Sequence, residues 1–130
     1  MYLVDTNIFL EVLLGRARRD RCKSFLRELR DGRRRGIVTD FTIHSIIVIM
    51  DRLRRLGELR VFLRSLLGYK GLHIYQTTLW DEVKAVEMAE RWGLDMDDAL
   101  QYSSALTAGV EAIVSYDKHF DGLEIPRIEP

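Results

Sequence analysis

Short apolar segments alternate with longer amphipathic segments along the chain, and this alternation limits the folds open to it more than any other feature. Each short segment has the length and the apolar character of a buried strand. Four such segments occur, and an extended piece follows them: residues 2–4, 37–39, 72–76, 112–115 and 124–128. Strands that alternate with helices favour a parallel sheet with helices on both faces. The sequence therefore predicts an α/β fold with a central parallel sheet of four to five short strands flanked by helices.

Capping residues and glycines predict where the helices in the middle of the chain begin and end. Asp40 or Thr42 has the chemistry of a cap for the helix that follows the second strand, and we expect this helix to reach about Leu56. Gly57 is expected to break it, because glycine favours the left-handed conformation that ends helices. A further helix should then end near Leu67.

The second half of the chain holds two more helical patterns. Thr78 and Asp81 have the spacing of a capping box at the start of the first one. Leu79, Val83 and Val86 line one face of that helix, whereas charged side chains, Asp81 among them, line the other. The second pattern is "DMDDALQYSSALTA", which begins at residue 95 and is closed by a glycine.

The composition indicates a cytoplasmic protein of one domain. A chain of 130 residues that is 47% hydrophobic can bury a good core but seldom divides, so we expect a single domain over residues 1–130. Lys and Arg (20) balance Asp and Glu (20), and nucleic-acid binding would therefore rest on local patches. Cys22 is the single cysteine, which excludes an internal disulfide. No apolar stretch is long enough to cross a bilayer or to form a secretory signal, so no role at a membrane is expected.

Acidic residues fall at positions that the predicted sheet would bring together. Asp5 ends the first strand, Asp117 follows the "AIVS" strand by two residues, and Asp97 and Asp98 lie in the first turn of the preceding helix. In parallel sheets of this kind, sites gather at the carboxyl ends of the strands. Crowded carboxylates repel one another unless a cation compensates, and hard divalent ions prefer oxygen ligands. The pattern therefore indicates a candidate metal site.

Each of these acids also has a purely structural interpretation. Asp5 or Asn7 has the chemistry of an N-cap for the helix after the first strand. If Thr6 or Asn7 takes that task, the Asp5 carboxylate remains free to face a metal. Asp95 and Asp98 have the spacing of a capping arrangement, and the last acid suits a loop turn.

Three segments, taken together, resemble the motifs of a known family. "VDTNIFLE" at the start, "MDDALQYSSAL" near position 100 and "IVSYDKHFD" after it resemble, in order and spacing, the motifs of PIN-domain ribonucleases. The resemblance covers nearly the whole chain. By size, the chain is most similar to the VapC toxins of toxin–antitoxin pairs.

The resemblance implies an acidic site that binds one or two Mg²⁺ or Mn²⁺ ions and hydrolyses RNA phosphodiesters. Asp5, Asp98 and Asp117 match the first, third and fourth acids of the family, which makes them the expected catalytic residues and metal ligands. Thr6 matches a hydroxyl residue that supports the first acid. Asn7 matches a residue that more often fixes the turn from strand to helix.

The second acid of the family, a glutamate early in the helix after the second strand, is missing. Ser45 stands at the position that aligns with it, and we expect reduced or strongly Mn²⁺-dependent activity. His44 offers an imidazole that could bind a softer ion such as Mn²⁺, although an ordinary polar role is the alternative. Asp97, Lys118 and His119 are further candidates because they lie beside the matched acids, and the last two are placed to meet substrate.

The resemblance also implies partners. PIN toxins commonly form homodimers and are held inactive by a small VapB-type antitoxin whose tail enters the acidic site. The segments 43–50 and 58–67 carry more apolar residues than one buried stripe needs, which indicates either an interface or a thick core. Arginines offer phosphate contacts or simply a solvated face, and they cluster at 16–19, 33–35 and 52–60.

Two other functions agree with parts of the pattern. A PIN-like binding module without turnover would act through protein or RNA partners, and the missing glutamate supports it. A phosphatase or a phosphoacceptor receiver also places an aspartate at the end of a parallel strand. However, Asn7 stands where the phosphatase repeats its acid, and both of these functions leave Asp98 and Asp117 unexplained.

Overall fold

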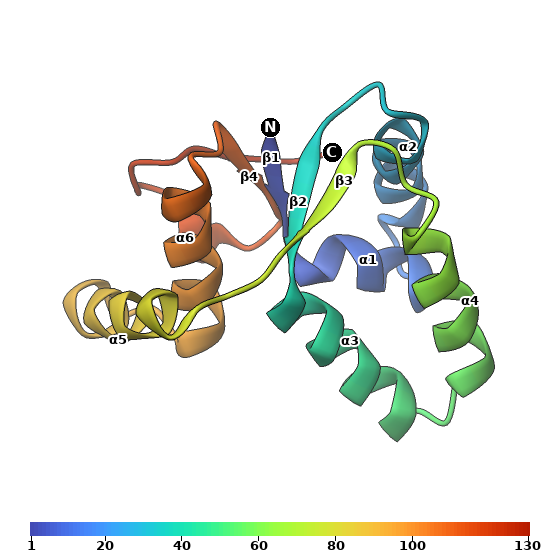
Figure 1. Ribbon diagram of the computed structural model, residues 1–130, viewed down its shortest axis with the longest axis horizontal. Coiled ribbons are helices and arrows are strands. Elements are labelled where there is room, and N and C mark those ends of the chain that lie inside the picture. Colours follow the sequence, from blue (N-terminus) through green and yellow to red (C-terminus); the bar gives the residue numbers. More distant parts are fainter.

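The computed structural model describes all residues, 1–130, and contains one sheet of five strands (Figure 1). The strand order is β3-β2-β1-β4-β5, and every neighbouring pair is parallel. The strands are β1 (Tyr2–Val4), β2 (Gly36–Thr39), β3 (Leu72–Tyr75), β4 (Ala112–Val114) and β5 (Arg127–Ile128). The predicted α/β fold with a central parallel sheet is confirmed, and the extended piece near the C-terminus supplies the fifth strand.

Six α-helices cover the sheet. They are α1 (Thr6–Leu13), α2 (Arg19–Asp31), α3 (Asp40–Arg52), α4 (Leu56–Leu66), α5 (Leu79–Trp92) and α6 (Met96–Ala108). Figure 1 shows α1 to α4 on one side of the strands and α5 and α6 on the other. None of these helices combines the length and the apolar character that a membrane crossing requires.

Alternate residues of the strands enter two different cores. Val4 and Val38 pack with apolar residues of α1, α2 and α3 in the larger core. Leu3 and Ile37, one residue earlier in the same strands, pack with α6 in the second core. This alternation follows from the two-residue period of a strand, and it explains why strands buried on both faces are apolar throughout.

The expected break at Gly57 is wrong. α3 ends at Arg52, and Arg54 adopts the left-handed conformation with φ of 57°. The backbone N–H groups of Arg54 and Arg55 donate to carbonyls of the last turn of α3, so the turn is completed before Gly57 is reached. Gly57 lies within the first turn of α4.

The cap of α3 also differs from expectation. Thr39, rather than Asp40 or Thr42, is the N-cap, and its hydroxyl accepts the N–H of Thr42 at 3.1 Å. The helix therefore begins earlier than expected. As a result, the Thr42 side chain is buried inside the fold instead of capping a helix.

The predicted capping box of α5 is confirmed, but the apolar face of Leu79, Val83 and Val86 is not the face that this helix buries. Thr78 Oγ1 accepts the N–H of Asp81 at 3.2 Å, and Asp81 Oδ2 accepts the N–H of Thr78 at 2.9 Å. Asp81 and Ala85 are buried against α6, where the Ser103 hydroxyl donates to the Asp81 carbonyl. Small residues at this contact let the two helices approach closely. The apolar face that begins with Leu79 is left exposed.

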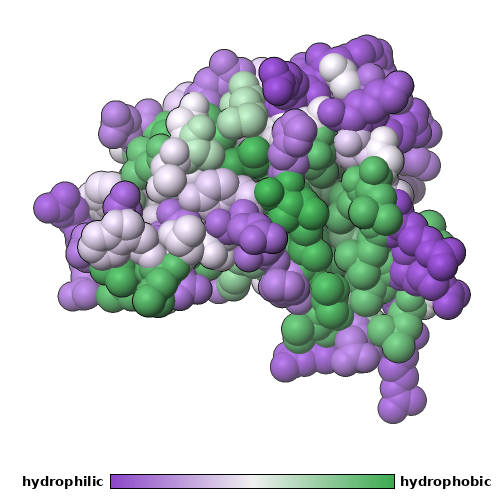
Figure 2. All heavy atoms as spheres, in the orientation of Figure 1, coloured by the Kyte–Doolittle hydropathy of each residue, from purple (hydrophilic) through white to green (hydrophobic).

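Most of the large apolar side chains that are exposed lie in two regions. On α5, Leu79 is 77% exposed and Trp80 is 70% exposed. The second region comprises α3, α4 and their connections, where Val48, Val61 and Leu67 are exposed. Figure 2 shows hydrophobic side chains gathered over α3 and α4 on the face that it presents. The apolar excess in the segments 43–50 and 58–67 is therefore only partly used in the core.

Candidate functional site

A polar cavity of about 260 Å³ lies at the carboxyl end of the sheet. Asp5 follows β1 directly, Asp98 lies in the first turn of α6, and Asp117 precedes a short 3₁₀ turn, η1 (Lys118–Phe120). All three acids line this cavity. Its polar lining is completed by Thr6, Asn7, Ser45, Asp95, Asp97 and Gln101.

Asp5 is buried, and hydrogen bonds hold both oxygens of its carboxylate. Oδ1 accepts the backbone N–H of Thr6 at 2.8 Å and Nε2–H of Gln101 at 3.3 Å, whereas Oδ2 accepts the hydroxyl of Ser115 at 2.7 Å. Asp5 is itself the N-cap of α1, so neither Thr6 nor Asn7 takes that task. Burial raises the pKa of Asp5 above its ordinary value, although these three donors oppose the shift. The Asp5 side chain therefore caps α1 and lines the cavity at the same time.

A network of hydrogen bonds among three hydroxyls and one amide holds the Asp5 carboxylate in place. Gln101 Nε2–H donates to the hydroxyl of Thr42 at 2.8 Å, and Gln101 Oε1 accepts the hydroxyl of Thr39 at 2.8 Å. The hydroxyls of Thr42 and Thr6 lie 2.8 Å apart and share a hydrogen bond. The amide of Gln101 thus connects α6, α3 and the Asp5 carboxylate. This satisfied network fixes the orientation of the acid.

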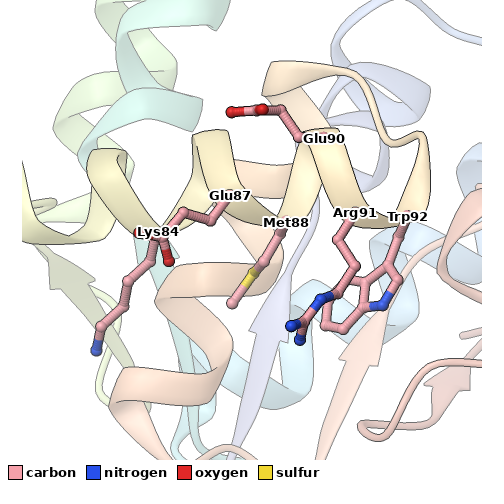
Figure 3. Close-up of a pocket in the computed structure, with 6 residues that line it drawn as sticks. All are labelled: Lys84, Glu87, Met88, Glu90, Arg91 and Trp92. Carbon is pink, nitrogen blue, oxygen red and sulfur yellow. The ribbon is translucent and has the colours of Figure 1, made fainter.

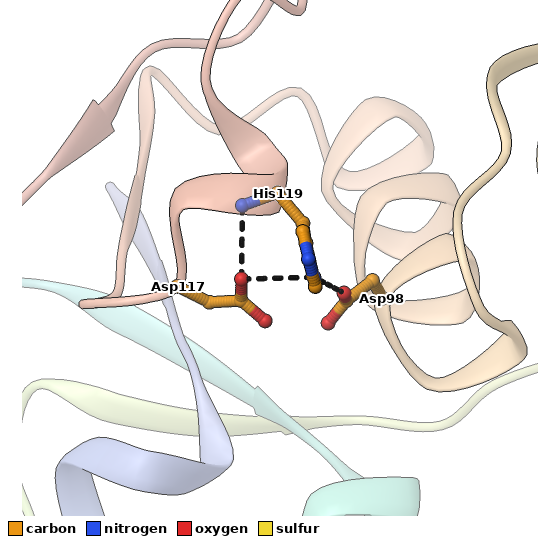
Figure 4. A group of neighbouring side chains, drawn as sticks. All are labelled: Asp98, Asp117 and His119. Carbon is orange, nitrogen blue, oxygen red and sulfur yellow. Dashed lines mark hydrogen bonds and ion pairs between the residues drawn. The ribbon is translucent and has the colours of Figure 1, made fainter.

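Asp98, Asp117 and His119 form a compact group in which one ligand atom from each residue lies within 4.8 Å of the others. His119 Nδ1 lies 3.1 Å from Asp98 Oδ2 and 3.1 Å from Asp117 Oδ1. Figure 4 shows the imidazole reaching between the two carboxylates. Asp5 lies outside this group, but Ser115 connects it to Asp117, because the Ser115 hydroxyl also accepts the Asp117 N–H at 2.9 Å.

The pKa values in this group reflect crowding of negative charge. Burial, together with the charges of Asp117 and Asp95, raises the pKa of Asp98 to about 7. The hydrogen bond with Asp98 and the charge of Asp117 raise the pKa of His119. No lysine or arginine forms an ion pair with Asp5, Asp98 or Asp117. The fold thus holds the carboxylates together without a side chain of permanent positive charge.

The other residues singled out from the sequence lie at different places. Ser45 lines the cavity at the position where the sequence resemblance expects a glutamate, and Asn7 and Asp97 line it as well. His44 is exposed on α3 and does not line the cavity. Lys118 is exposed beside the cavity in sequence but is not part of its lining.

The donor set of the compact group fits a divalent cation. It offers two carboxylates and one imidazole, and carboxylate oxygens are the ligands that Mg²⁺ and Mn²⁺ prefer. Asp95 takes over the capping of α6 by accepting the N–H of Asp98 at 2.9 Å, which leaves the Asp98 carboxylate free. A cation between Asp98 and Asp117 would relieve the repulsion that raises the pKa of Asp98.

Sequence reasoning missed the residues that hold Asp5. Gln101 follows Asp98 by three residues and therefore lies on the same face of α6, a spacing that could have identified it. Ser115 precedes Asp117 by two residues, at the end of β4. The role of Thr42 had no comparable signal, because its partner Gln101 comes from a distant helix.

A larger cavity, of about 640 Å³, lies along α5 (Figure 3). All of its lining residues come from this single helix: Lys84, Glu87, Met88, Glu90, Arg91 and Trp92. Two acids and two bases line it, so their charges compensate locally. We therefore place the candidate site at the acidic cavity.

Comparisons with known proteins agree on one fold. The PIN domain family model matches residues 2–125. The structure of the toxin VapC20 from Mycobacterium tuberculosis, described as cleaving the sarcin–ricin loop, has a TM-score of 0.80 at 16% identity, with 100% of both chains covered.

Two toxin–antitoxin structures are also similar to this chain. A toxin–antitoxin complex from Klebsiella pneumoniae has a TM-score of 0.74 at 16% identity and covers 98% of this chain and 96% of its own. VapBC2 from Rickettsia felis, bound to a promoter DNA fragment, has a TM-score of 0.71 at 15% identity and covers 98% and 97%. No curated protein matches the sequence. At these identities the structures establish a shared fold.

Proposed function

Because this chain belongs to the PIN domain family, we propose that it is a divalent-metal-dependent ribonuclease and the toxin of a toxin–antitoxin pair. One observation carries the proposal: Asp5, Asp98 and Asp117, far apart in sequence, line a single cavity at the carboxyl end of the sheet. The similarity to structures described as toxins and toxin–antitoxin complexes supports the biological role.

The proposed chemistry is hydrolysis of an RNA phosphodiester by water. Asp98 and Asp117 would hold the metal ion, and Asp5 would add a third carboxylate to the lining of the cavity. A bound divalent ion supplies Lewis-acid activation of water and neutralises charge that develops on the phosphate. Gln101 and Ser115 keep the Asp5 carboxylate from rotating, because each donates to a different oxygen. This chain's residues therefore act mainly by positioning charge.

The basic segment at 16–19 is the best supported contact for RNA. Its arginines are exposed, and the Arg18 guanidinium lies over the Tyr116 ring, 4.1 Å from its centroid. Tyr116 directly precedes Asp117, so the Arg18 guanidinium contacts a residue that is next in sequence to the acidic site. By contrast, Arg33 and Arg34 form ion pairs with acids of α2. RNA binding through 16–19 should weaken as salt rises.

We also propose a homodimer and a small VapB-type antitoxin as partners, each at one of the apolar surfaces. A groove of about 360 Å³ between α1, α2 and α4 is lined mostly by apolar residues, including Phe9, Leu26 and Phe62. Its concave shape suits a peptide segment of an antitoxin. The exposed stripe that begins with Leu79 and Trp80 on α5 is convex and suits contact with a second copy of the chain.

A PIN-like binding module that lacks turnover is the second candidate. Ser45 favours it, because a hydroxyl lines the cavity where the family has a carboxylate. Loss of one charged ligand weakens metal binding, which would lower the rate of hydrolysis without changing the fold.

Metal binding and RNA cleavage by the purified chain test the proposal. We expect cleavage of RNA with Mn²⁺ or Mg²⁺, and we expect chelation and Asp98→Asn to abolish it. Asp20→Asn, an exposed carboxylate on α2 outside the cavity, is the matched control and should leave cleavage unchanged. Metal binding without cleavage would favour the binding module. Cleavage that survives both Asp5→Asn and Asp98→Asn would contradict the assigned site.

A further inference from the structure

We infer that His119 is a nitrogen ligand of the metal in this cavity and that its imidazole shifts the site from Mg²⁺ towards Mn²⁺. The inference rests on the proposed function, since it concerns the same ion. The sequence offered His44 as the imidazole donor, but His44 is exposed on α3 and does not belong to the group of side chains that could hold an ion. His119 belongs to the compact group with Asp98 and Asp117.

The distances from the imidazole to the two carboxylates match those between neighbouring ligands of one ion. Nδ1 of His119 lies 3.1 Å from Oδ2 of Asp98 and 3.1 Å from Oδ1 of Asp117. Two ligands at right angles around an ion, each about 2.1 Å from it, lie about 3.0 Å apart. A cation can therefore replace the shared hydrogen-bond contacts with little movement of the three side chains.

The local chain holds His119 in place for this role. Asp117 caps the η1 turn, and its Oδ1 accepts the backbone N–H of His119 at 2.9 Å. Phe120, the next residue, is fully buried and anchors the turn in the second core. The His119 side chain is 70% exposed, so no packing prevents the small rotation that would centre Nδ1 on an ion. The backbone at His119 is thus fixed, while its imidazole can rotate towards an ion.

The imidazole also compensates for the absent carboxylate. Ser45 offers a neutral hydroxyl at the cavity, which leaves Asp5, Asp98 and Asp117 as the acids matched to the family. His119 adds a donor without adding a fourth negative charge to a group that is already crowded. Mg²⁺ prefers oxygen ligands. Mn²⁺ accepts an imidazole ligand more readily than Mg²⁺ does, and later first-row ions bind imidazole well. A mixed nitrogen and oxygen set should therefore lower the relative affinity for Mg²⁺.

Binding of MnCl₂ and MgCl₂ to the chelator-treated full chain tests the inference by calorimetry. For His119→Ala we expect Mn²⁺ affinity to fall by about tenfold or more and Mg²⁺ affinity by less than about threefold. His119→Asp restores an all-oxygen set and should shift the Mn²⁺/Mg²⁺ affinity ratio towards Mg²⁺. His73→Ala, an exposed histidine on β3, is the matched control and should change neither affinity.

Pulsed electron paramagnetic resonance of bound Mn²⁺ gives a second readout that does not depend on activity. The wild-type chain should show ¹⁴N modulation from a coordinated imidazole, and His119→Ala should lose it. Bound Mn²⁺ without ¹⁴N modulation, or a loss in His44→Ala instead, would overturn the inference while leaving the proposed function intact. Equal or tighter Mn²⁺ binding in His119→Ala would also overturn it, because the imidazole would then compete with the ion. Failure of the wild-type chain to bind either ion would overturn the proposed metal dependence as well.

Discussion

Asp81 and Asp98 occupy equivalent positions at the starts of two neighbouring helices, yet the fold uses them differently. Each lies three residues after an N-cap, Thr78 for α5 and Asp95 for α6. Each is buried, with 2% and 7% of the residue exposed. The Asp81 carboxylate accepts hydrogen bonds from Tyr75, Thr78 and Thr107. The Asp98 carboxylate instead faces Asp117 and His119.

The two environments shift the pKa values in opposite directions. Burial alone would raise the pKa of Asp81, but its hydrogen-bond donors outweigh burial and hold that pKa below its ordinary value. Burial and the charges of Asp117 and Asp95 raise the pKa of Asp98 to about 7. A buried acid surrounded by donors stabilises the fold, whereas one that faces another acid costs stability until a cation arrives. The same spacing in sequence thus serves a structural role in α5 and a candidate site in α6.

The largest difference should be in RNA cleavage. Asp98→Asn removes a proposed metal ligand, so we expect cleavage to fall by at least about a hundredfold. Substitution of a residue that only supports a metal ligand costs up to about a hundredfold, and loss of the ligand itself should cost no less. Asp81→Asn should change cleavage by less than about threefold at a temperature where the variant is folded. Initial rates on one RNA at saturating Mn²⁺ measure both. Equal losses in the two variants would abolish the proposed contrast.

Stability should show the reverse order. Asp81→Asn replaces a carboxylate that accepts several hydrogen bonds with an amide that can accept fewer, and we expect a loss of about 2 kcal/mol in the free energy of unfolding. Urea denaturation at pH 7 in the presence of a chelator measures this loss. Asp98→Asn, under the same conditions, should not destabilise the chain. A loss in Asp98→Asn as large as that in Asp81→Asn would mean that its carboxylate is structural.

The two acids should also give opposite pH dependence. Because the pKa of Asp98 is raised to about 7, the folded chain binds a proton that the unfolded chain releases, and stability falls as pH rises from about 4 to about 7. Asp98→Asn cannot ionise, so its free energy of unfolding should match that of wild type near pH 4 and exceed it by a margin that grows as pH rises towards about 7. The lowered pKa of Asp81 acts in the other sense, since its contribution is lost as pH falls below about 4.

Metal-free unfolding curves across pH 4–8 measure this difference. A parallel series in a His119→Ala background removes the titration of the imidazole, whose pKa is raised in the same cluster. A constant gap between wild type and Asp98→Asn over the whole range would contradict the assignment of the raised pKa to this carboxyl group.

The sequence was enough to predict the sheet and the acids at its edge, because both depend on local patterns. The short apolar strands stand out from the helices, and an acid at the end of a parallel strand must lie at the carboxyl edge. The break between α3 and α4 was not predictable, because the residue type of Arg54 does not signal the left-handed conformation that it adopts. The nearby Gly57 does not adopt that conformation. Helix boundaries are set there by the turn and not by the glycine.

The buried face of α5 and the support of Asp5 were missed for a different reason. Leu79 and its apolar neighbours predict the buried face of an isolated amphipathic helix, but packing of Asp81 and Ala85 against small residues of α6 overrides that pattern. Gln101 reaches Asp5 across the fold, and a contact between residues so far apart follows from the tertiary structure alone. Local patterns therefore predict where the acids lie. Tertiary packing decides which acid is surrounded by hydrogen-bond donors, as Asp81 is, and which faces another acid, as Asp98 does.

Removal of a single donor from Asp81 should give the smallest effect. Tyr75 donates its hydroxyl to Asp81 Oδ2 at 2.9 Å, and three other hydrogen bonds to that carboxylate remain in Tyr75→Phe. We expect a loss of about 1 kcal/mol in the free energy of unfolding, together with a small upward shift in the pKa of Asp81. Urea denaturation at pH 7 and at a pH well below 4 measures both, because the loss should shrink only once Asp81 becomes protonated below its lowered pKa. Phe62→Leu, a change in the other core, should give a loss that does not vary with pH. An equally pH-independent loss in Tyr75→Phe would show that the ring, and not its hydroxyl, stabilises α5.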